Sequence, residues 1–174
     1  MSDSPFPPIS SFDGEPDFTL TAASLKTLLD RTRFAAAREM TRYAINGVLF
    51  EKKGKKLSLV ATDGHRLAQT KDDTIGEEDG KDVSAVVPIK AINLIERLLT
   101  DPEQLVSLQF KENKLFVQVG NAGESGTAMG GVTATMSTSL VEGTFPPYAD
   151  VIPKDSDKKV TLNRDRFFSA VRRA

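Results

Sequence analysis

The residues best suited to chemistry in this 174-residue chain are Asp63 and its single histidine, His65, which flank Gly64. A carboxylate beside an imidazole can act as a general base or activate a nucleophile, but such a site also needs a third, orienting group and a cleft. Sequence spacing supplies neither, so catalysis is disfavoured and we expect no enzyme. Asp-Gly is a common turn pair, and the residues around it alternate like strands. We therefore expect a tight turn between two strands here.

Metal and phosphate sites find little support in the composition. The chain has no cysteine and only one histidine, so neither a cysteine-based nor a histidine-rich metal site can form within it. We expect no metal and no cofactor. The Gly-rich segment 121–131 (NAGESGTAMGG) lacks the Lys-Ser/Thr pair of a P-loop and does not join a strand to a helix. An α+β domain that binds a small molecule or acts as an enzyme through segment 121–131 is the alternative function.

Basic residues concentrate on two predicted helices. The net charge of -1 argues against a protein that holds nucleic acid by bulk positive charge. Lys26 and Arg31 nevertheless lie away from the apolar stripe of the first helix, and Lys90 and Arg97 lie away from that of the second. A solvated face explains each helix alone, but two basic helices on one side of an acidic protein fit a phosphate-facing surface equally well.

The elements that must position these residues occur in the same order twice. The first half is predicted to contain strand 17–20, helix 21–34 and strands 43–51, 56–62 and 66–71. The second half is predicted to contain strand 83–87, helix 88–99 and strands 105–111, 114–120 and 132–140. Thr21 suits a helix N-cap and Pro88 a first helical turn. The doubled order predicts an α+β fold with both helices side by side on one face of antiparallel sheets.

A longer repeat links the two ends of the chain. Phe-Pro-Pro occurs at 6–8 and at 145–147, and related Thr-Leu segments at 18–21 and 160–163 each lead into a helical pattern. The offset between Thr19 and Thr161 is 142 residues, which is the length of a domain rather than of a solenoid repeat. We expect one complete unit of a tandem array. The composition is ordinary for a globular protein, with neither a membrane-length apolar run nor a signal peptide, so we expect a cytoplasmic location.

Three spaced motifs resemble one family: RYAINGVLFE at 42–51, VATDGHRLA at 60–68 and LVEGTFPPY at 140–148. In this order they are similar to the middle domain of the bacterial DNA polymerase III beta subunit, the sliding-clamp family. The resemblance implies four segments. They are a linker from a preceding clamp domain at 1–16, the middle clamp domain at 17–144, an interdomain connector at 145–158, and the first strand and helix of a truncated third domain at 159–174.

The resemblance also implies a DNA-clamp fold and a function. Family members carry three similar domains per subunit, and two subunits close into a ring whose helices line a hole around duplex DNA. The implied function is that of a non-catalytic processivity factor, which tethers the replicative polymerase, the clamp loader and repair proteins. The implied DNA-facing residues are Lys26, Arg31, Lys90 and Arg97. The full-length protein is expected to be a ring homodimer and this chain alone a monomer.

In the family, partners bind through a short peptide that enters a hydrophobic cleft between the second and third domains. Carried over to this sequence, the cleft wall comprises Arg42, Ile45, Thr62, Gly64, His65, Arg66, Leu67, Pro146 and Val151. Apolar members would receive anchor side chains, and the turn at 62–66 would supply hydrogen-bond donors. The sequence departs from a familiar family pattern at Ala44 and Asp150. A protein-binding module unrelated to DNA remains a second alternative.

Overall fold

The computed structural model describes residues 12–37, 44–75, 81–122, 129–153 and 157–173. The first half contains β1 (Phe18–Thr21), α1 (Ala22–Asp30), the 3-10 helix η1 (Arg33–Ala35), β2 (Gly47–Lys53), β3 (Lys56–Thr62) and β4 (Leu67–Asp73). The second half contains β5 (Val83–Pro88), α2 (Ile89–Leu98), β6 (Leu105–Lys111), β7 (Lys114–Ala122) and β8 (Met129–Ser139). The 3-10 helix η2 (Tyr148–Val151) and α3 (Arg164–Val171) follow. The predicted order of one strand, one helix and three strands, twice over, is confirmed.

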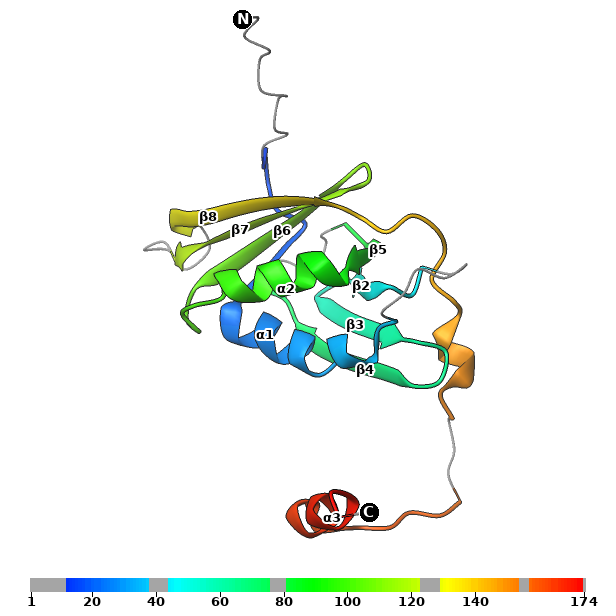
Figure 1. Ribbon diagram of the computed structural model, residues 1–174. Helices are drawn as coiled ribbons and strands as arrows, with labels where there is room; N and C mark the ends of the chain where they lie inside the picture. The colour runs from blue at the N-terminus through cyan, green and yellow to red at the C-terminus, as the bar shows by residue number, and fades with distance from the viewer. Residues whose placement is uncertain (1–11, 38–43, 76–80, 123–128, 154–156, 174) are drawn as a thin grey trace, which may run out of the picture.

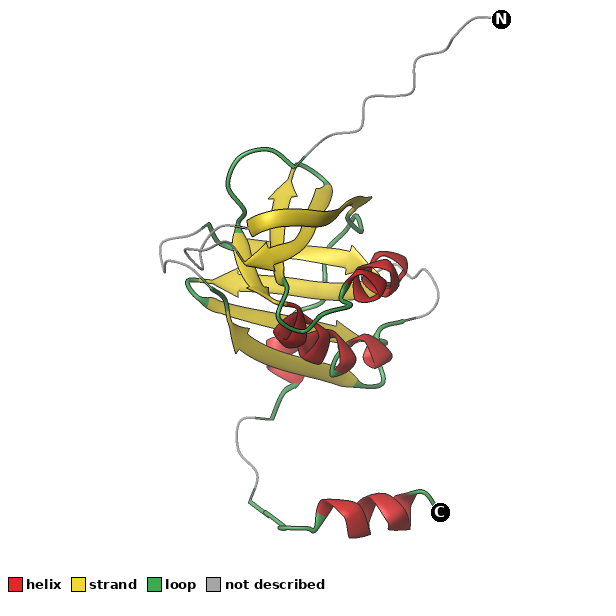
Figure 2. Ribbon diagram, turned by 90° about the vertical axis from the view of Figure 1, so that its left-hand side faces the viewer, coloured by secondary structure: helices red, strands yellow, loops and turns green. Residues whose placement is uncertain are grey.

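Two four-stranded antiparallel sheets interlock the halves. One sheet has the order β1-β6-β7-β8 and the other β4-β3-β2-β5. Figure 1 labels most of these strands, and Figure 2 shows the strands and helices from the side. Each sheet therefore joins three strands of one half to the first strand of the other. The exchange is fixed by register, with Leu20 opposite Val106 and Leu49 opposite Val86. Neither half can complete its sheet alone, so the two halves form one domain.

Both helices cover the same side of the sheets (Figure 1). α1 contacts β1, β4 and β6, whereas α2 contacts β2, β5 and β8. An ion pair links the two helical segments, because Arg33 Nη1 lies 2.8 Å from Glu96 Oε2. The predicted α+β arrangement, with two helices on one face of antiparallel sheets, is confirmed.

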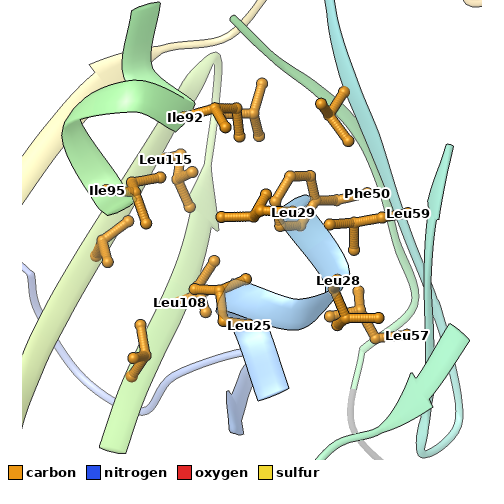
Figure 3. Packing of buried hydrophobic residues seen from close by; sticks show 14 of the residues in the cluster. Leu25, Leu28, Leu29, Phe50, Leu57, Leu59, Ile92, Ile95, Leu108 and Leu115 are labelled. Atoms are coloured by element: carbon orange, nitrogen blue, oxygen red, sulfur yellow. The ribbon is translucent and has the colours of Figure 1, made fainter. Parts of the chain in front are cut away.

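The core lies between this helix pair and the two sheets (Figure 3). Its largest side chains come from both helices and both sheets: Leu25, Leu28, Leu29, Ile92, Ile95, Phe50, Leu57, Leu59, Leu108 and Leu115. Each of these residues is at most 2% exposed. Complete burial of one such side chain stabilises the fold by roughly 1.5–3 kcal/mol relative to exposure. These apolar contacts hold both helices against both sheets and fix their outward faces.

Two predicted boundaries are wrong because hydrogen bonds outside the regular pattern take over there. Helix 21–34 begins as predicted, since the Thr21 side chain caps it by accepting from the Ser24 N–H, but α1 ends at Asp30. Buried Thr32 then leaves helical geometry and donates its hydroxyl to the Leu28 carbonyl. The second strand starts at Gly47 rather than 43. Its expected first residues bond elsewhere, the Ala44 N–H to the Thr144 carbonyl and the Ile45 carbonyl to the Ala37 N–H.

The segments at the two ends of the chain differ in how they are held. Gln109 Nε2 donates to the carbonyls of Asp13 and Glu15, so the described end of the predicted linker is anchored to β6. At the other end α3 forms as predicted, with Asn163 as its N-cap, but the strand expected at 160–163 does not form. A strand needs a partner, and no described strand pairs with this segment. None of the described helices is long and apolar enough to cross a membrane.

Candidate functional site

The predicted turn between β3 and β4 is built around Asp63. Asp63 Oδ1 accepts the backbone N–H groups of His65 and Arg66, each at 3.0 Å, and its Oδ2 accepts from Arg66 Nε at 3.0 Å. These hydrogen bonds, first the two from the backbone, hold the pKa of the Asp63 carboxyl below its usual value. Gly64 has φ +89°, a left-handed conformation that favours glycine. The Asp-Gly pair therefore shapes the turn, as expected.

The hydrogen-bond donors of this turn are already used. The Thr62 hydroxyl donates to the Arg66 carbonyl at 2.7 Å and accepts from the Gly64 N–H at 3.1 Å. The expectation that Thr62 and the Gly64 backbone would offer donors to a ligand is therefore wrong. Two side chains remain available, the exposed His65 imidazole and the Arg66 guanidinium, which lies 5.9 Å from the centre of the Phe34 ring. Phe34 is itself 57% exposed.

An apolar cluster covers the other face of the β4-β3-β2-β5 sheet, away from the helices. We call it the outer cluster. Its buried members are Ala44, Leu49, Val60 and Val86, and its partly buried members are Leu67, Val141, Phe145 and Tyr148. Three of these residues belong to the segment 140–151, which we call the connector. The Val141 N–H donates to the Val86 carbonyl at 2.9 Å, so the connector is hydrogen-bonded to β5 as well as packed on the sheet.

The structure brings some of the predicted cleft residues together but not all. Leu67 and the connector that carries Pro146 meet in or beside the outer cluster, and both residues are half-buried. Ile45 and Thr62 are buried, so they offer little contact surface and instead support the wall. Val151 is 69% exposed at the end of η2 and Asp150 is exposed beside it. Arg42 lies outside the described residues.

Sequence reasoning missed the polar group that holds the connector. The Tyr148 hydroxyl donates to the Glu51 carboxylate and accepts from Gln69 Nε2 at 3.4 Å. Burial, followed by the bond to Glu51, raises the pKa of Tyr148 to about 12. A tyrosine next to Phe-Pro-Pro is a detectable signal, but its carboxylate partner lies 97 residues away in the sequence. A short spacing motif cannot connect two residues that far apart.

The connector also borders a hollow of about 790 Å³ against the outer faces of β2 and β5. The walls of this hollow include Leu49, Val86, Phe145 and Pro146. Leu67 does not line it, and Pro146 does not line the second hollow described below. Neither of these two hollows is therefore lined by both Leu67 and Pro146.

The predicted DNA-facing residues all lie on the helical side. All four are exposed: Lys26 on α1, Arg31 at its C-cap, and Lys90 and Arg97 on α2. Arg33, a basic residue that was not predicted to face DNA, lies on the same side and pairs with Glu96 and, at 3.6 Å, with Asp30. Burial raises the pKa of Glu96, and Arg33 opposes that shift.

The second hollow, of about 930 Å³, lies between η1 and the start of α2. Arg33, Phe34, Arg66 and Lys90 are among its lining residues. Arg66 thus borders both the helical face and the β3–β4 turn, which makes the two candidate surfaces neighbours.

The described residues favour binding over catalysis. They contain no group of three or more histidine, aspartate or glutamate side chains that could hold a metal ion. Asp63 is occupied by the backbone of its own turn, and His65 is fully on the surface. The Gly-rich segment 121–131 lies partly outside the described residues. The geometry offers the apolar outer cluster beside a turn with two exposed side chains, His65 and Arg66, and a helical side that carries exposed basic residues and adjoins the turn at Arg66.

Comparison with known proteins identifies the family to which this domain belongs. A family model described as "DNA polymerase III beta subunit, central domain" matches residues 19–147. A beta sliding clamp of Proteus mirabilis is 37% identical over 172 residues, which is 98% of this chain and 43% of that protein. The beta sliding clamp of Escherichia coli K12 is 34% identical over 169 residues, 97% of this chain and 42% of that protein.

Solved structures agree with this. The DNA polymerase III beta subunit of Pseudomonas aeruginosa matches with a TM-score of 0.80 at 32% identity, over 99% of this chain and 44% of that one. The DNA polymerase sliding clamp of Bacillus subtilis matches with a TM-score of 0.84 at 25% identity, over 100% of this chain and 42% of that one. The chain thus spans a little over two fifths of the length of these relatives. It belongs to the DNA polymerase III beta-subunit family, the non-catalytic bacterial sliding clamps, and contains the central domain of that family.

Proposed function

We propose that this chain is the central part of a DNA polymerase processivity factor that encircles duplex DNA and tethers its partners by a peptide cleft. The observation that carries the proposal is that the connector packs beside the β3–β4 turn in a domain that matches the clamp central domain over residues 19–147. The partners would be the replicative polymerase, the clamp loader and repair proteins that carry a clamp-binding peptide motif.

The cleft would use the exposed and half-buried residues of this surface. Leu67 and Pro146 would form the apolar floor, since buried anchors carry most of the energy of a peptide interface. His65 and Arg66 would contact the peptide backbone or its polar side chains. Val151 would extend the wall, with Ile45 and Thr62 supporting it from behind. A relative supports a ligand-binding role for this family: one Pseudomonas aeruginosa clamp, 33% identical with a TM-score of 0.78, was solved bound to griselimycin.

The helical face would line the hole of the ring. Lys26, Arg31, Lys90 and Arg97 are exposed there, and a ring holds DNA by topology, so a few weak phosphate contacts are sufficient. Strong contacts would hinder sliding. The carboxylates of Asp30 and Glu96 next to Arg33 moderate the positive charge of this face, which fits a surface that slides rather than grips.

We also infer four segments: a linker at 1–16, the central domain at 17–144, an interdomain segment at 145–158 that overlaps the connector defined above, and the start of a third domain at 159–174. The C-terminal segment supports this because α3 resembles α1 at an offset of 142 residues. A side chain caps the start of each helix, Thr21 for α1 and Asn163 for α3. Core residue Leu25 corresponds to Phe167, which is 55% exposed. An apolar residue exposed at a core position fits a helix whose packing partners belong to a further domain.

The test of the proposed cleft is an NMR titration of the ¹⁵N-labelled chain with a clamp-binding peptide rich in Gln, Leu and Phe. We expect saturable shift changes at the amides of Gly64, Leu67 and Val151, with a scrambled peptide of the same composition as control. Affinity is expected to be low, because the second side of the cleft would come from the third domain. Shift changes confined to the Gly-rich segment 121–131, or none with the intact motif, would contradict the proposal.

A further inference from the structure

The connector is held on the sheet by two kinds of contact at its two ends. Its beginning is fixed by backbone, with Val141 bonded to Val86 and the Thr144 carbonyl accepting from the Ala44 N–H at 3.5 Å. Its end has no comparable backbone bond to the sheet among the described residues. There the Tyr148 side chain makes the contact, at the first residue of η2.

Three adjacent strands each supply one polar side chain beneath Tyr148. Glu51 on β2 lies opposite Ser58 on β3, and Gln69 on β4 donates to the Ser58 hydroxyl at 3.2 Å and to the Tyr148 hydroxyl at 3.4 Å. The Tyr148 hydroxyl completes the group by donating to Glu51. The phenol thus donates one hydrogen bond and accepts another, which satisfies both of its capacities.

The ring of Tyr148 is oriented as well as its hydroxyl. It meets the Phe145 ring edge-on, with centroids 6.2 Å apart and an interplanar angle of 78°, which is a favourable aromatic geometry. Both rings pack in the outer cluster with Leu67. Since burial and Glu51 raise the pKa of Tyr148 to about 12, the phenol remains a neutral donor throughout the physiological pH range.

Tyr148 lies between two residues of the proposed cleft wall, so its contacts bear on where those residues lie. Pro146 precedes it by two residues, and Val151 follows it by three, which is one turn of the 3-10 helix η2. Both are proposed wall residues of the cleft, and Val151 is 69% exposed, so its own packing holds it only weakly. The anchor that sets where these two side chains stand relative to Leu67 is therefore Tyr148.

We propose that Tyr148, through its hydrogen bonds to Glu51 and Gln69, is a positioning residue that sets Pro146 and Val151 beside Leu67 for peptide binding. This inference rests on the proposed function. Tyr148 need not touch the peptide. Its hydrogen bonds restrict the conformations of the connector before the peptide binds. Peptide binding therefore costs less conformational entropy.

The test compares peptide affinity among variants of this hydrogen bond, using the same chain, peptide and NMR titration. Tyr148→Phe keeps the ring and removes the hydroxyl, and Glu51→Ala removes the acceptor. We expect each to weaken peptide binding by about tenfold, the effect of one hydrogen bond to a charged group. Glu51→Gln retains an acceptor oxygen and is expected to stay within about twofold of the wild type. The double variant Tyr148→Phe/Glu51→Ala should be no weaker than either single variant, because both remove the same interaction.

A stability control separates positioning from folding. Ile92→Val shortens a fully buried side chain of α2 in the main core, a cluster separate from the outer cluster that contains Tyr148, and is expected to lower the melting temperature. We expect it to leave peptide affinity unchanged, whereas Tyr148→Phe lowers affinity even at temperatures where both variants are fully folded. Binding by Tyr148→Phe within twofold of the wild type, or equal weakening by Ile92→Val, would overturn the positioning role. A wild-type chain that binds no peptide would instead refute the proposed cleft, and this inference with it.

Discussion

The two halves of the domain approach closely at Gly47, and replacing this residue by alanine tests the strand exchange directly. Gly47 pairs with Pro88 where β2 runs beside β5. A Cβ added at Gly47 would lie 2.4 Å from the Val87 carbonyl oxygen and 2.8 Å from Val86 Cγ1. Because the first of these atoms belongs to the backbone, no side-chain rotation can relieve the clash, and β2 and β5 must separate locally.

The expected cost follows from this geometry. Overpacking of a well-packed interior typically costs 1–3 kcal/mol, and a clash with backbone places Gly47→Ala at the upper end, about 2–3 kcal/mol. A change of 1 kcal/mol shifts the melting temperature by about 2–4 °C in a chain of this size. We therefore expect the melting temperature to fall by about 4–12 °C.

The control is the same substitution at Gly131 in β8. An added Cβ there meets no heavy atom within 4 Å, so Gly131→Ala is expected to change stability by less than about 0.5 kcal/mol. Thermal and urea unfolding followed by circular dichroism would measure both variants. If Gly47→Ala is as stable as Gly131→Ala, the close approach of β2 and β5 does not exist as described, and the argument for interlocked halves loses its support.

Three further predictions concern the surfaces. Leu67→Ala should weaken peptide binding by ~2 kcal/mol or more, whereas Asp150→Ala should change it little, because buried anchors outweigh rim charges; calorimetry that finds Leu67→Ala unchanged would count against the cleft. Asp63 has a folded-state pKa below its unfolded value, so its stabilising contribution is present above about pH 4 and is lost as the pH falls. Urea unfolding across this range should therefore show a smaller acid loss for Asp63→Asn than for the wild type. The 174-residue chain alone should sediment as a monomer and bind linear duplex DNA negligibly at ~150 mM salt; a stable dimer would contradict the inferred boundaries, and tight DNA binding would favour a protein that reads DNA grooves.

Much of the fold was predictable because its signals are local. Alternating apolar residues marked most strands to within two or three positions, and Thr21 marked the start of α1. The errors occur where a hydrogen bond outside the regular helix or strand pattern competes with the tendency of the segment. Thr32 ends the helix by bonding to Leu28, and Ala44 leaves the strand pattern to bond with Thr144, 100 residues away. Neither contact has a counterpart in the periodicity of its own segment.

The candidate site was predictable only in part for a related reason. Resemblance to a family located the turn at 62–67 and the connector, but it could not say which side chains face outward. The Thr62 hydroxyl and the Gly64 N–H are consumed within the turn. Ile45 is buried, so its role is support rather than contact. These outcomes depend on hydrogen-bond partners and burial, which residue types alone do not determine.

One sequence signal for the missed connector contact does exist, in the strands beneath it. An antiparallel sheet with one face in water alternates apolar and polar residues, whereas a sheet covered on both faces does not. On β2, Val48 and Phe50 face the core, yet the intervening Leu49 is apolar too and belongs to the outer cluster. Val60 on β3 repeats this pattern.

Apolar residues on both faces of two central strands predict that a second layer covers the outer face. The Tyr-containing segment after Phe-Pro-Pro is the apolar, aromatic stretch that can supply this layer. That same segment carries Pro146 and Val151. When it packs on the outer face of the sheet, it therefore also positions these two residues of the proposed cleft wall. Glu51 lies two residues after Leu49 on β2 and therefore on the same, covered face, opposite Ser58 on β3. It is the polar residue on that face that can pair with Tyr148. The single carboxylate on β2, a strand that is apolar on both faces, thus indicates Glu51 as the partner of Tyr148.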